Sequence, residues 1–231
     1  MPRHIAIVED EPDIRENYAD LFRRQGYQVS SYPDRQSAQR AFDCRLPDLA
    51  ILDIGLQDEI DAGFELCRQL RARSETLPII FLTARDSDFD TISGLRLGAD
   101  DYLTKDVSLH QLSARVAALF RRIRALQDAA LEDMGEQIRT ASLHLDMDQL
   151  RATWRGEDLA LTVTETWILH ALAKHPGHVR SRDQLMEAAN TYVDSGTITS
   201  HIKRLRRKFQ QTDPDFSHIE AVYGAGYRWK P

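Results

Sequence analysis

Residues 5–11 read IAIVEDE, a continuous apolar run that ends in three acidic side chains. Four consecutive apolar residues of this kind are typical of a strand that is buried on both faces. The pattern returns at residues 49–53, which read LAILD, and at residues 79–83, which read IIFLT. The three runs therefore predict buried strands, each followed or closed by a polar side chain.

Stretches with helical spacing separate these runs. Residues 14–22 carry apolar side chains at helical intervals, and Gly26 follows where a helix C-cap is expected. The other elements expected in this half are a strand around Val29, helices over residues 35–44, 64–70 and around residues 92–95, a strand over residues 102–104, and a helix from Ser108 to Ile123. Five strand–helix units of this type predict an α/β fold, a doubly wound five-stranded parallel sheet covered on both faces.

The character of the chain changes after Ile123. Residues 123–136 are polar, which predicts a helical extension that runs into a linker. Short alternating segments over residues 138–161 predict antiparallel strands, and the final residues predict a hairpin. Three helices are expected between them, over residues 165–175, 182–189 and 196–210. The expected organisation is one domain over residues 1–122, a linker over residues 123–136, and a smaller α+β domain over residues 137–231.

Composition narrows the class of protein. The chain has 231 residues, a formal net charge of −6, 42% hydrophobic and 29% charged residues, which suits a globular protein of two domains. Its two cysteines, Cys44 and Cys67, indicate buried thiols in a reducing compartment. No signal-peptide pattern opens the chain, and no apolar run approaches the roughly 20 residues that span a bilayer. We expect a cytoplasmic protein.

Polar residues follow the predicted strands. Glu9, Asp10, Asp53, Thr83 and Lys105 all come at the carboxyl ends of strands, which meet at one edge of a parallel sheet. Clustered carboxylates repel one another unless a cation is present, and oxygen ligands favour Mg²⁺. The lysine and threonine suit an incoming phosphoryl group, so the central aspartate is the expected nucleophile. Ordinary solvated acids at strand ends are the alternative, which leaves the lysine and threonine unexplained.

These residues resemble the receiver domain of two-component response regulators, a flavodoxin-like fold, across roughly residues 3–122. The matching motifs are residues 8–11 (VEDE), 52–53 (LD), 82–85 (LTAR) and 98–105 (GADDYLTK). The resemblance implies that Asp53 accepts a phosphoryl group from a partner histidine kinase. It also implies a Mg²⁺ site, whose ligands are Glu9, Asp10, Asp53 and the Gly55 carbonyl. It further implies a switch, in which Thr83, Tyr102 and Lys105 respond to the phosphoryl group.

Two departures from that family stand beside the site. Asp106 replaces the usual proline after Lys105, and because a cis bond without proline costs about 3–4 kcal/mol, we expect a trans bond and a differently aimed lysine. The loop over residues 54–63 is longer and more acidic than usual. Together with residues 63–67 (GFELC), this loop resembles regulators associated with proteobacterial sortase systems.

The densest positive charge lies in residues 203–208, which read KRLRRK. Ile198, Ile202, Leu205 and Phe209 follow helical spacing, so one stripe is expected to pack inward and to leave Ser200, His201, Arg204 and Lys208 on the other side. A helix with such a face fits the major groove of DNA, where arginine binds guanine edges or phosphates. A solvated basic helix is the alternative.

This half resembles the winged-helix effector domain of the OmpR/PhoB class, across roughly residues 137–230. The motifs are residues 161–165 (LTVTE), 181–185 (SRDQL), 197–208 (TITSHIKRLRRK) and 224–228 (GAGYR). The resemblance implies a recognition helix, a wing that reaches the minor groove, and a loop before the helix that touches RNA polymerase. The implied DNA contacts are Thr197, Ser200, His201, Lys203, Arg204, Arg206, Arg207, Lys208, Tyr223 and Arg228. Tyr223 stands where the family commonly has arginine, which predicts a weaker wing contact.

Several charged residues of the first domain suggest how two copies of the chain would associate. In the resembled class such charges join two receivers after phosphorylation, which implies that Asp100, Asp101, Arg115 and Arg122 lie in a homodimer interface. The Lys/Glu pair usual nearby is replaced by Thr91 and Gln111, which predicts a weaker or differently arranged dimer.

The leading hypothesis is a phosphorylation-controlled transcription factor, not a turnover enzyme, with self-dephosphorylation as its expected hydrolytic step. One alternative is a Mg²⁺-dependent aspartyl phosphatase. Such an enzyme requires a second aspartate two residues after the nucleophile as its acid/base, and this chain has Gly55 there. The other alternative is a DNA-binding regulator whose receiver dimerises without phosphate.

Overall fold

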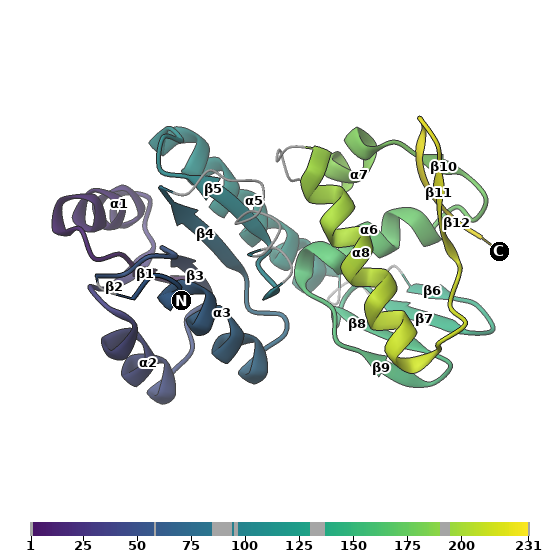
Figure 1. Cartoon of the computed structure of the whole chain (residues 1–231), viewed down its shortest axis with the longest axis horizontal. Helices are drawn as coiled ribbons and strands as arrows, with labels where there is room; N and C mark the ends of the chain where they lie inside the picture. Colours follow the sequence, from purple (N-terminus) through teal and green to yellow (C-terminus); the bar gives the residue numbers. More distant parts are fainter. Residues whose placement is uncertain are drawn as a thin grey trace. The chain divides into compact units, whose positions relative to one another are not determined.

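A computed structural model describes residues 2–57, 59–84, 94, 97–129, 137–189 and 195–230 of the chain. The chain divides into two compact units, Met1–Val116 and Ala117–Pro231 (Figure 1). Helix α5 (Leu109–Ala129) runs across the boundary between the units, and residues 130–136 lie outside the described part. None of the described helices is long and apolar enough to cross a membrane.

The first unit is built on a five-stranded sheet in the order β2-β1-β3-β4-β5, with every neighbouring pair parallel. This confirms the predicted doubly wound α/β arrangement. The strands are β1 (His4–Val8), β2 (Gln28–Tyr32), β3 (Leu49–Leu52), β4 (Ile79–Thr83) and β5 (Asp101–Thr104). The other helices described here are α1 (Pro12–Arg24), α2 (Arg35–Cys44) and α3 (Ala62–Arg73).

The strands are apolar throughout because helices cover both faces of the sheet. Ala6 and Val8 of β1 belong to a core that also contains Phe42 of α2 and Leu66 of α3. The alternate residues of β1 are equally buried. Figure 1 shows α2 and α3 on one face of the sheet and α1 and α5 on the other. The helix expected around residues 92–95 lies outside the described residues, apart from Gly94 and Leu97.

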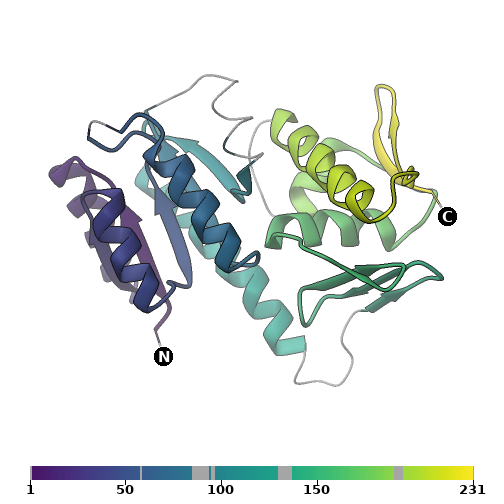
Figure 2. The same cartoon turned by 60° about the horizontal axis from the view of Figure 1, so that its bottom comes forward.

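The second unit is α+β, as predicted, and Figure 2 shows its two sheets and its helices. A four-stranded antiparallel sheet has the order β6-β7-β8-β9, and a three-stranded sheet has the order β10-β12-β11. The strands are β6 (Gln137–Arg139), β7 (Leu143–Asp146), β8 (Arg151–Trp154), β9 (Glu157–Leu159), β10 (Val179–Arg180), β11 (Ile219–Val222) and β12 (Gly226–Trp229). The helices are α6 (Val163–Ala173), α7 (Arg182–Ala188) and α8 (Ser195–Thr212).

The core of this unit centres on Trp154 of β8. Its ring packs edge-on against Phe209 of α8 and against Phe216, with centroid distances of 5.3 Å in both contacts. Capping boxes fix where two helices begin: Thr162 and Glu165 open α6, and Ser181 with its partner Gln184 opens α7. The two-residue strand β10 was not predicted.

Candidate functional site

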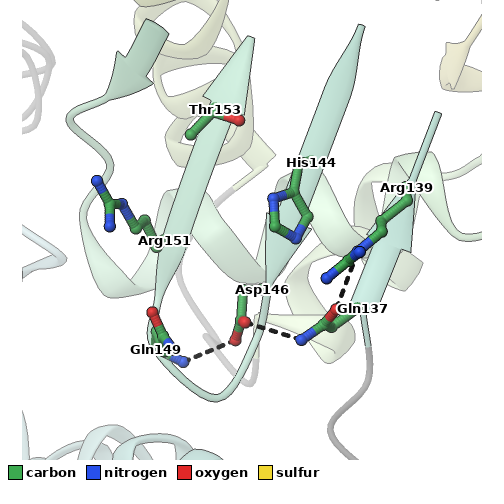
Figure 3. Close-up of a pocket in the computed structure, with 7 residues that line it drawn as sticks. All are labelled: Gln137, Arg139, His144, Asp146, Gln149, Arg151 and Thr153. Carbon is green, nitrogen blue, oxygen red and sulfur yellow. Dashed lines mark hydrogen bonds between the residues drawn. The ribbon is translucent and has the colours of Figure 1, made fainter. Parts of the chain in front are cut away.

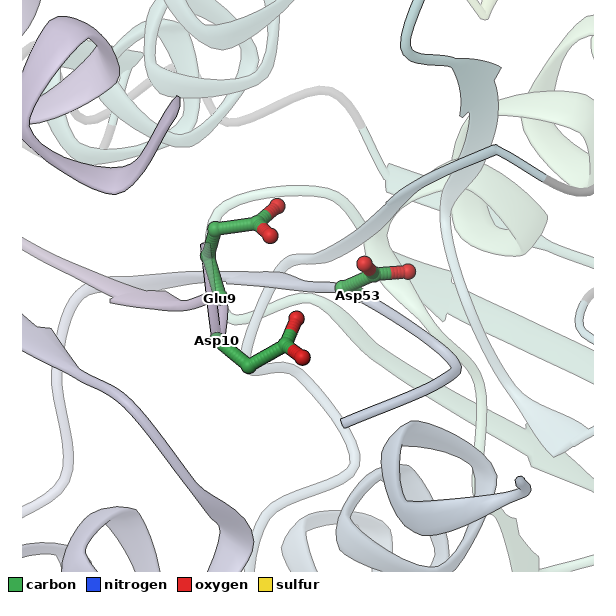
Figure 4. Close-up of side chains that lie close together, drawn as sticks. All are labelled: Glu9, Asp10 and Asp53. Carbon is green, nitrogen blue, oxygen red and sulfur yellow. The ribbon is translucent and has the colours of Figure 1, made fainter. Parts of the chain in front are cut away.

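The polar residues at the strand ends of the first unit lie together at one sheet edge. Glu9 and Asp10 follow β1, and Asp53 follows β3, where its N–H donates to the Val8 carbonyl at 2.9 Å. Carboxylate oxygens of these three acids lie within 4.8 Å of one another. Figure 4 shows their side chains directed toward a common space. Three oxygen donors at this separation fit a hard divalent cation such as Mg²⁺.

Lys105 supplies the positive charge at this edge. Its ammonium lies 2.7 Å from Oδ2 of Asp53, 2.9 Å from Oε1 of Glu9 and 3.3 Å from Oε1 of Glu11. The lysine follows β5, and its N–H donates to the Thr83 carbonyl at the end of β4. Four strand ends thus bring one cation and a group of acids into direct contact.

The electrostatics of the site follow from burial. Glu9 is 2% exposed, and this burial raises its pKa to about 7. The nearby charge of Asp53 adds to the rise, whereas the hydrogen bond from Lys105 opposes it. Burial of the Lys105 ammonium acts to lower its pKa, but the hydrogen bonds to Asp53 and Glu9 outweigh burial and raise it. Crowded carboxylates repel one another, so a bound cation would favour this arrangement.

The bond between Lys105 and Asp106 is trans, since no described peptide bond is cis. The expected change of aim was wrong, because the lysine still reaches Asp53. Asp106 instead accepts a hydrogen bond from the Thr104 hydroxyl, which ties the loop to the end of β5. A trans backbone and a flexible four-carbon side chain are enough to place the ammonium.

The two residues expected to respond to a phosphoryl group are buried. Thr83 is 1% exposed and Tyr102 is 4% exposed. The Tyr102 ring packs on Phe81 at a centroid distance of 6.2 Å. A Cβ on Gly94 would lie within 3.0 Å of both rings, so glycine lets that segment approach them. The Tyr102 ring is therefore packed inward, against Phe81.

The backbone after Asp53 is packed against the start of α3. A Cβ on Gly63 would collide with the Asp53 carbonyl oxygen, and the Gly63 N–H donates to the Ile54 carbonyl at 2.9 Å. Only glycine permits this approach. The Asp53 carboxylate accepts a hydrogen bond from the Ile54 N–H at 2.6 Å, so the acceptor side chain is oriented by its own loop.

Helix α8 of the second unit exposes fewer basic residues than expected. Lys203 and Arg207 are exposed, and Thr199 lies one turn before Lys203 on the same stripe. The placement of Ser200, His201 and Arg204 on the outer side was wrong, because they are 8%, 0% and 7% exposed. Thr197, another expected DNA contact, is 2% exposed. These positions are covered because α8 packs against α6, α7 and β9.

Three basic residues of α8, the buried Arg204 and the half-buried Arg206 and Lys208, hold the domain together. Arg204 Nε lies 2.8 Å from Oε1 of Glu165, and Lys208 Nζ lies 2.7 Å from its Oε2. Lys208 also donates to the Ala160 carbonyl. Arg206 donates two hydrogen bonds to the Ile219 carbonyl of β11, at 3.0 and 2.8 Å. These contacts fix α8 against α6 and the terminal hairpin.

The hairpin of β11 and β12 presents Tyr223 fully to solvent at its tip. Arg228 Nε lies 2.6 Å from a Glu220 carboxylate oxygen, so its charge is already partnered within the hairpin. The Tyr227 hydroxyl donates to Thr199 at 3.3 Å and so links the hairpin to α8. Thr199 was not among the expected DNA contacts, although its spacing of four residues from Lys203 puts both on one stripe of the helix.

Three of the residues expected in a dimer interface, Asp100, Asp101 and Arg115, are paired within one chain. The Asp100 side chain is fully buried, and its Oδ2 lies 2.9 Å from Arg71 Nη2 and 3.1 Å from the Ile79 N–H. Its expected place on a surface was therefore wrong. Asp101 Oδ2 lies 3.6 Å from Arg115 Nη1 in the same chain. The Arg122 side chain and Thr91 lie outside the described residues, and Gln111 caps α5 by exchanging hydrogen bonds with Ser108.

A hollow of about 320 Å³ lies over the β6–β9 sheet and is lined by Arg139, His144 and Arg151 among others (Figure 3). Asp146 accepts hydrogen bonds there from the Gln137 side chain and the Gln149 N–H, at 2.9 Å each. Arg151 is paired with Asp158 at 2.9 Å. Polar and apolar side chains alternate along these strands. The hollow therefore lies on the polar outer face of the sheet, whose inner face builds the core.

Comparison with known proteins agrees with this geometry. The family model of the response regulator receiver domain matches residues 5–117, and the model described as "Transcriptional regulatory protein, C terminal" matches residues 156–229. The transcriptional regulatory protein CreB of Escherichia coli (strain K12) is 37% identical over 230 residues, covering 96% of this chain and 95% of CreB. The chain belongs to the OmpR/PhoB class of two-component response regulators.

Other relatives of this response regulator span both domains as well. The transcriptional regulatory protein BaeR of Escherichia coli O6:H1 is 37% identical over 229 residues, covering 98% of this chain and 92% of BaeR. A solved structure of a mutant of RitR has a TM-score of 0.75 at 23% identity, covers 99% of both chains, and shows the fold. This response regulator thus has a receiver domain and a DNA-binding domain.

Proposed function

We propose that Asp53 accepts a phosphoryl group from a sensor histidine kinase and that the phosphorylated protein dimerises and binds promoter DNA in the cytoplasm. The observation that supports this proposal is the convergence of three carboxylates and Lys105 at one sheet edge. An Asp53 carboxylate oxygen attacks the phosphorus atom while the bond from phosphorus to the histidine nitrogen of the kinase breaks.

The residues present fit Mg²⁺, with ligands proposed from Glu9, Asp10, Asp53 and the Gly55 carbonyl. Bound Mg²⁺ supplies positive charge to the phosphoryl oxygens. Lys105 is placed to move its ammonium from the Asp53 carboxylate to a phosphoryl oxygen, which keeps a charge-assisted hydrogen bond throughout. Thr83 at the end of β4 offers a hydroxyl to the same group.

For DNA we propose that the exposed stripe Thr199, Lys203 and Arg207 of α8 enters the major groove and that Tyr223 contacts an adjacent minor groove. Arg204, Arg206 and Lys208, which are paired within the domain, orient that stripe and do not contact DNA. RNA polymerase is the proposed partner of the segment before α8, and residues 190–194 of that segment lie outside the described residues.

The test compares the wild-type protein with Asp53→Asn after incubation with acetyl phosphate and Mg²⁺. Light scattering measures the oligomeric state, and fluorescence anisotropy measures affinity for promoter DNA selected from a random-sequence pool. Phosphorylated wild type is expected to dimerise and to bind roughly tenfold more tightly, because a dimer links two half-site readers. Equal DNA affinity with and without acetyl phosphate would instead favour a receiver that works without phosphate.

A further inference from the structure

The turn that follows β3 and Asp53 contains a residue whose backbone lies in the left-handed region of φ and ψ. Gln57 has a φ of 52°, a conformation that favours glycine. Leu56 and Glu59 exchange both backbone hydrogen bonds around it, at 3.1 and 3.0 Å. A strained turn of this kind persists only when its surroundings hold it.

Arg35 provides one such hold from outside the turn. Its Nε lies 2.7 Å from Oε2 of Glu59, and its Nη2 lies 3.4 Å from Oε1. Arg35 is the first residue of α2, and its side chain is only 24% exposed. A two-pronged contact of arginine with carboxylate fixes direction as well as distance. The turn is therefore tied to the start of a neighbouring helix.

The same turn reaches the carboxylate cluster through its backbone. The Gln57 N–H donates to Oδ2 of Asp10 at 2.9 Å. In the described part of the chain this is the only hydrogen bond to the Asp10 carboxylate, whereas Glu9 and Asp53 are both held by Lys105. With Oδ2 held, Oδ1 of Asp10 remains for a cation.

We propose that Arg35 and Glu59 are positioning residues that orient the Asp10 carboxylate for Mg²⁺ through the Gln57 N–H. The inference rests on the proposed function, since it takes Mg²⁺ to be the ion at the three carboxylates. Opening the contact between Arg35 and Glu59 frees the turn, and the Asp10 side chain then loses its fixed rotamer. Ordering that side chain again opposes ion binding.

The charge of Arg35 separates positioning from a simple field effect. Arg35→Ala removes a positive charge near a cation site, so the field alone makes Mg²⁺ bind more tightly. Loss of positioning makes it bind more weakly. Arg35→Lys keeps the charge but gives up the two-pronged geometry, so it changes positioning with almost no change of field.

The experiment titrates the full-length protein with Mg²⁺ alone in a calorimeter, with no phosphodonor present. Arg35→Ala, Glu59→Gln and Arg35→Lys are each expected to raise the Kd roughly two- to fivefold, the range for one partly exposed ion pair. The double variant Arg35→Ala/Glu59→Gln is expected to be no weaker than the weaker single variant. Arg40→Ala, which removes an exposed arginine from the same helix, is the control and is expected to keep or slightly lower the Kd.

Thermal unfolding without Mg²⁺ shows that each variant is folded. Arg35→Lys keeps the test decisive if Arg35→Ala does not fold, because it conserves the charge, whereas Glu59→Gln weakens Mg²⁺ binding through the field as well. Wild-type or tighter binding by the folded Arg35 variants would overturn this inference alone. A wild-type protein that takes up no Mg²⁺ would overturn both the inference and the metal site in the proposed function.

Discussion

Nζ of Lys105 lies 2.7 Å from Oδ2 of Asp53 and 2.9 Å from Oε1 of Glu9, so one ammonium contacts two nearly buried carboxyl groups. The three side chains follow β5, β3 and β1; in the sheet, β3 is next to β1, and β4 lies between β3 and β5. Removing a partner from such a group leaves charges with little water to solvate them. The receiver domain therefore depends on this lysine before any phosphoryl group arrives.

Lys105→Met is expected to lower the free energy of unfolding of the receiver by about 3 kcal/mol without Mg²⁺, because two buried carboxylates lose their counter-charge. Mg²⁺ should restore part of the loss. Urea unfolding followed by circular dichroism, with and without Mg²⁺, measures both effects. Lys203→Met, at an exposed position of α8, serves as the control and should unfold like the wild type.

Glu165 makes the stability of the DNA-binding domain depend on pH. Burial acts to raise its pKa, but the charges of Arg204 and Lys208 outweigh burial and lower it from 4.5 to about 2. A lowered pKa contributes stability that is fully present above pH 4.5 and is lost as the pH falls toward 2. The loss is expected to reach roughly 3 kcal/mol.

The three tryptophans of the chain all lie in the second unit, so their fluorescence reports unfolding of that domain alone. Glu165→Gln should flatten the loss of stability between pH 4.5 and 2 and should lower stability at pH 7. An unchanged acid transition in this variant would show that the buried ion pairs do not control it.

Exposure predicts different effects for two arginines on α8. Arg207→Ala should weaken DNA binding and reduce the slope of log Kd against log salt by about 1, because one phosphate contact is lost. Arg204→Ala should lower the stability of the domain, because the buried Glu165 carboxylate loses a partner at 2.8 Å. Anisotropy at several salt concentrations, paired with urea unfolding, separates the two. A reduced salt slope with unaltered stability in Arg204→Ala would contradict the burial of that residue.

Asp100 is expected to stabilise the receiver and not to join two receivers. Asp100→Ala should lower the free energy of unfolding by about 3 kcal/mol, because Arg71 loses its partner and the Ile79 N–H its acceptor. Urea unfolding at a concentration where the protein is monomeric measures this. If the Asp100→Ala monomer were as stable as the wild type but failed to dimerise after phosphorylation, Asp100 would instead belong to the dimer interface.

The architecture was predictable because its strongest signals are local. A run such as residues 49–52 is apolar at every position only when both faces of a strand are covered, and helix α2 was predicted at its observed bounds, Arg35–Cys44. The strand β10 has two residues and carries no periodicity, so pattern alone could not find it.

The exposed face of α8 was less predictable because charge was taken as a mark of exposure. Arg204 and Lys208 are attractive DNA contacts in sequence, but Glu165 lies far from them along the chain and meets them only after folding. A buried acid can hold two basic residues inward at the cost of their role at the surface. The prediction that Lys105 would point elsewhere failed for a different reason. A trans bond before Asp106 does not stop the long lysine side chain from reaching Asp53.

The central claim is that Asp53 is the phosphoacceptor. Intact-mass measurement after incubation with acetyl phosphate and Mg²⁺ tests it most directly, with Asp53→Asn and Asp10→Asn as the paired variants. The wild type is predicted to gain one phosphoryl group, and Asp53→Asn none. Asp10→Asn is predicted to gain it more slowly, because it keeps the nucleophile but loses a proposed Mg²⁺ ligand. A phosphoryl group of equal yield on Asp53→Asn, or none on the wild type, would contradict the account.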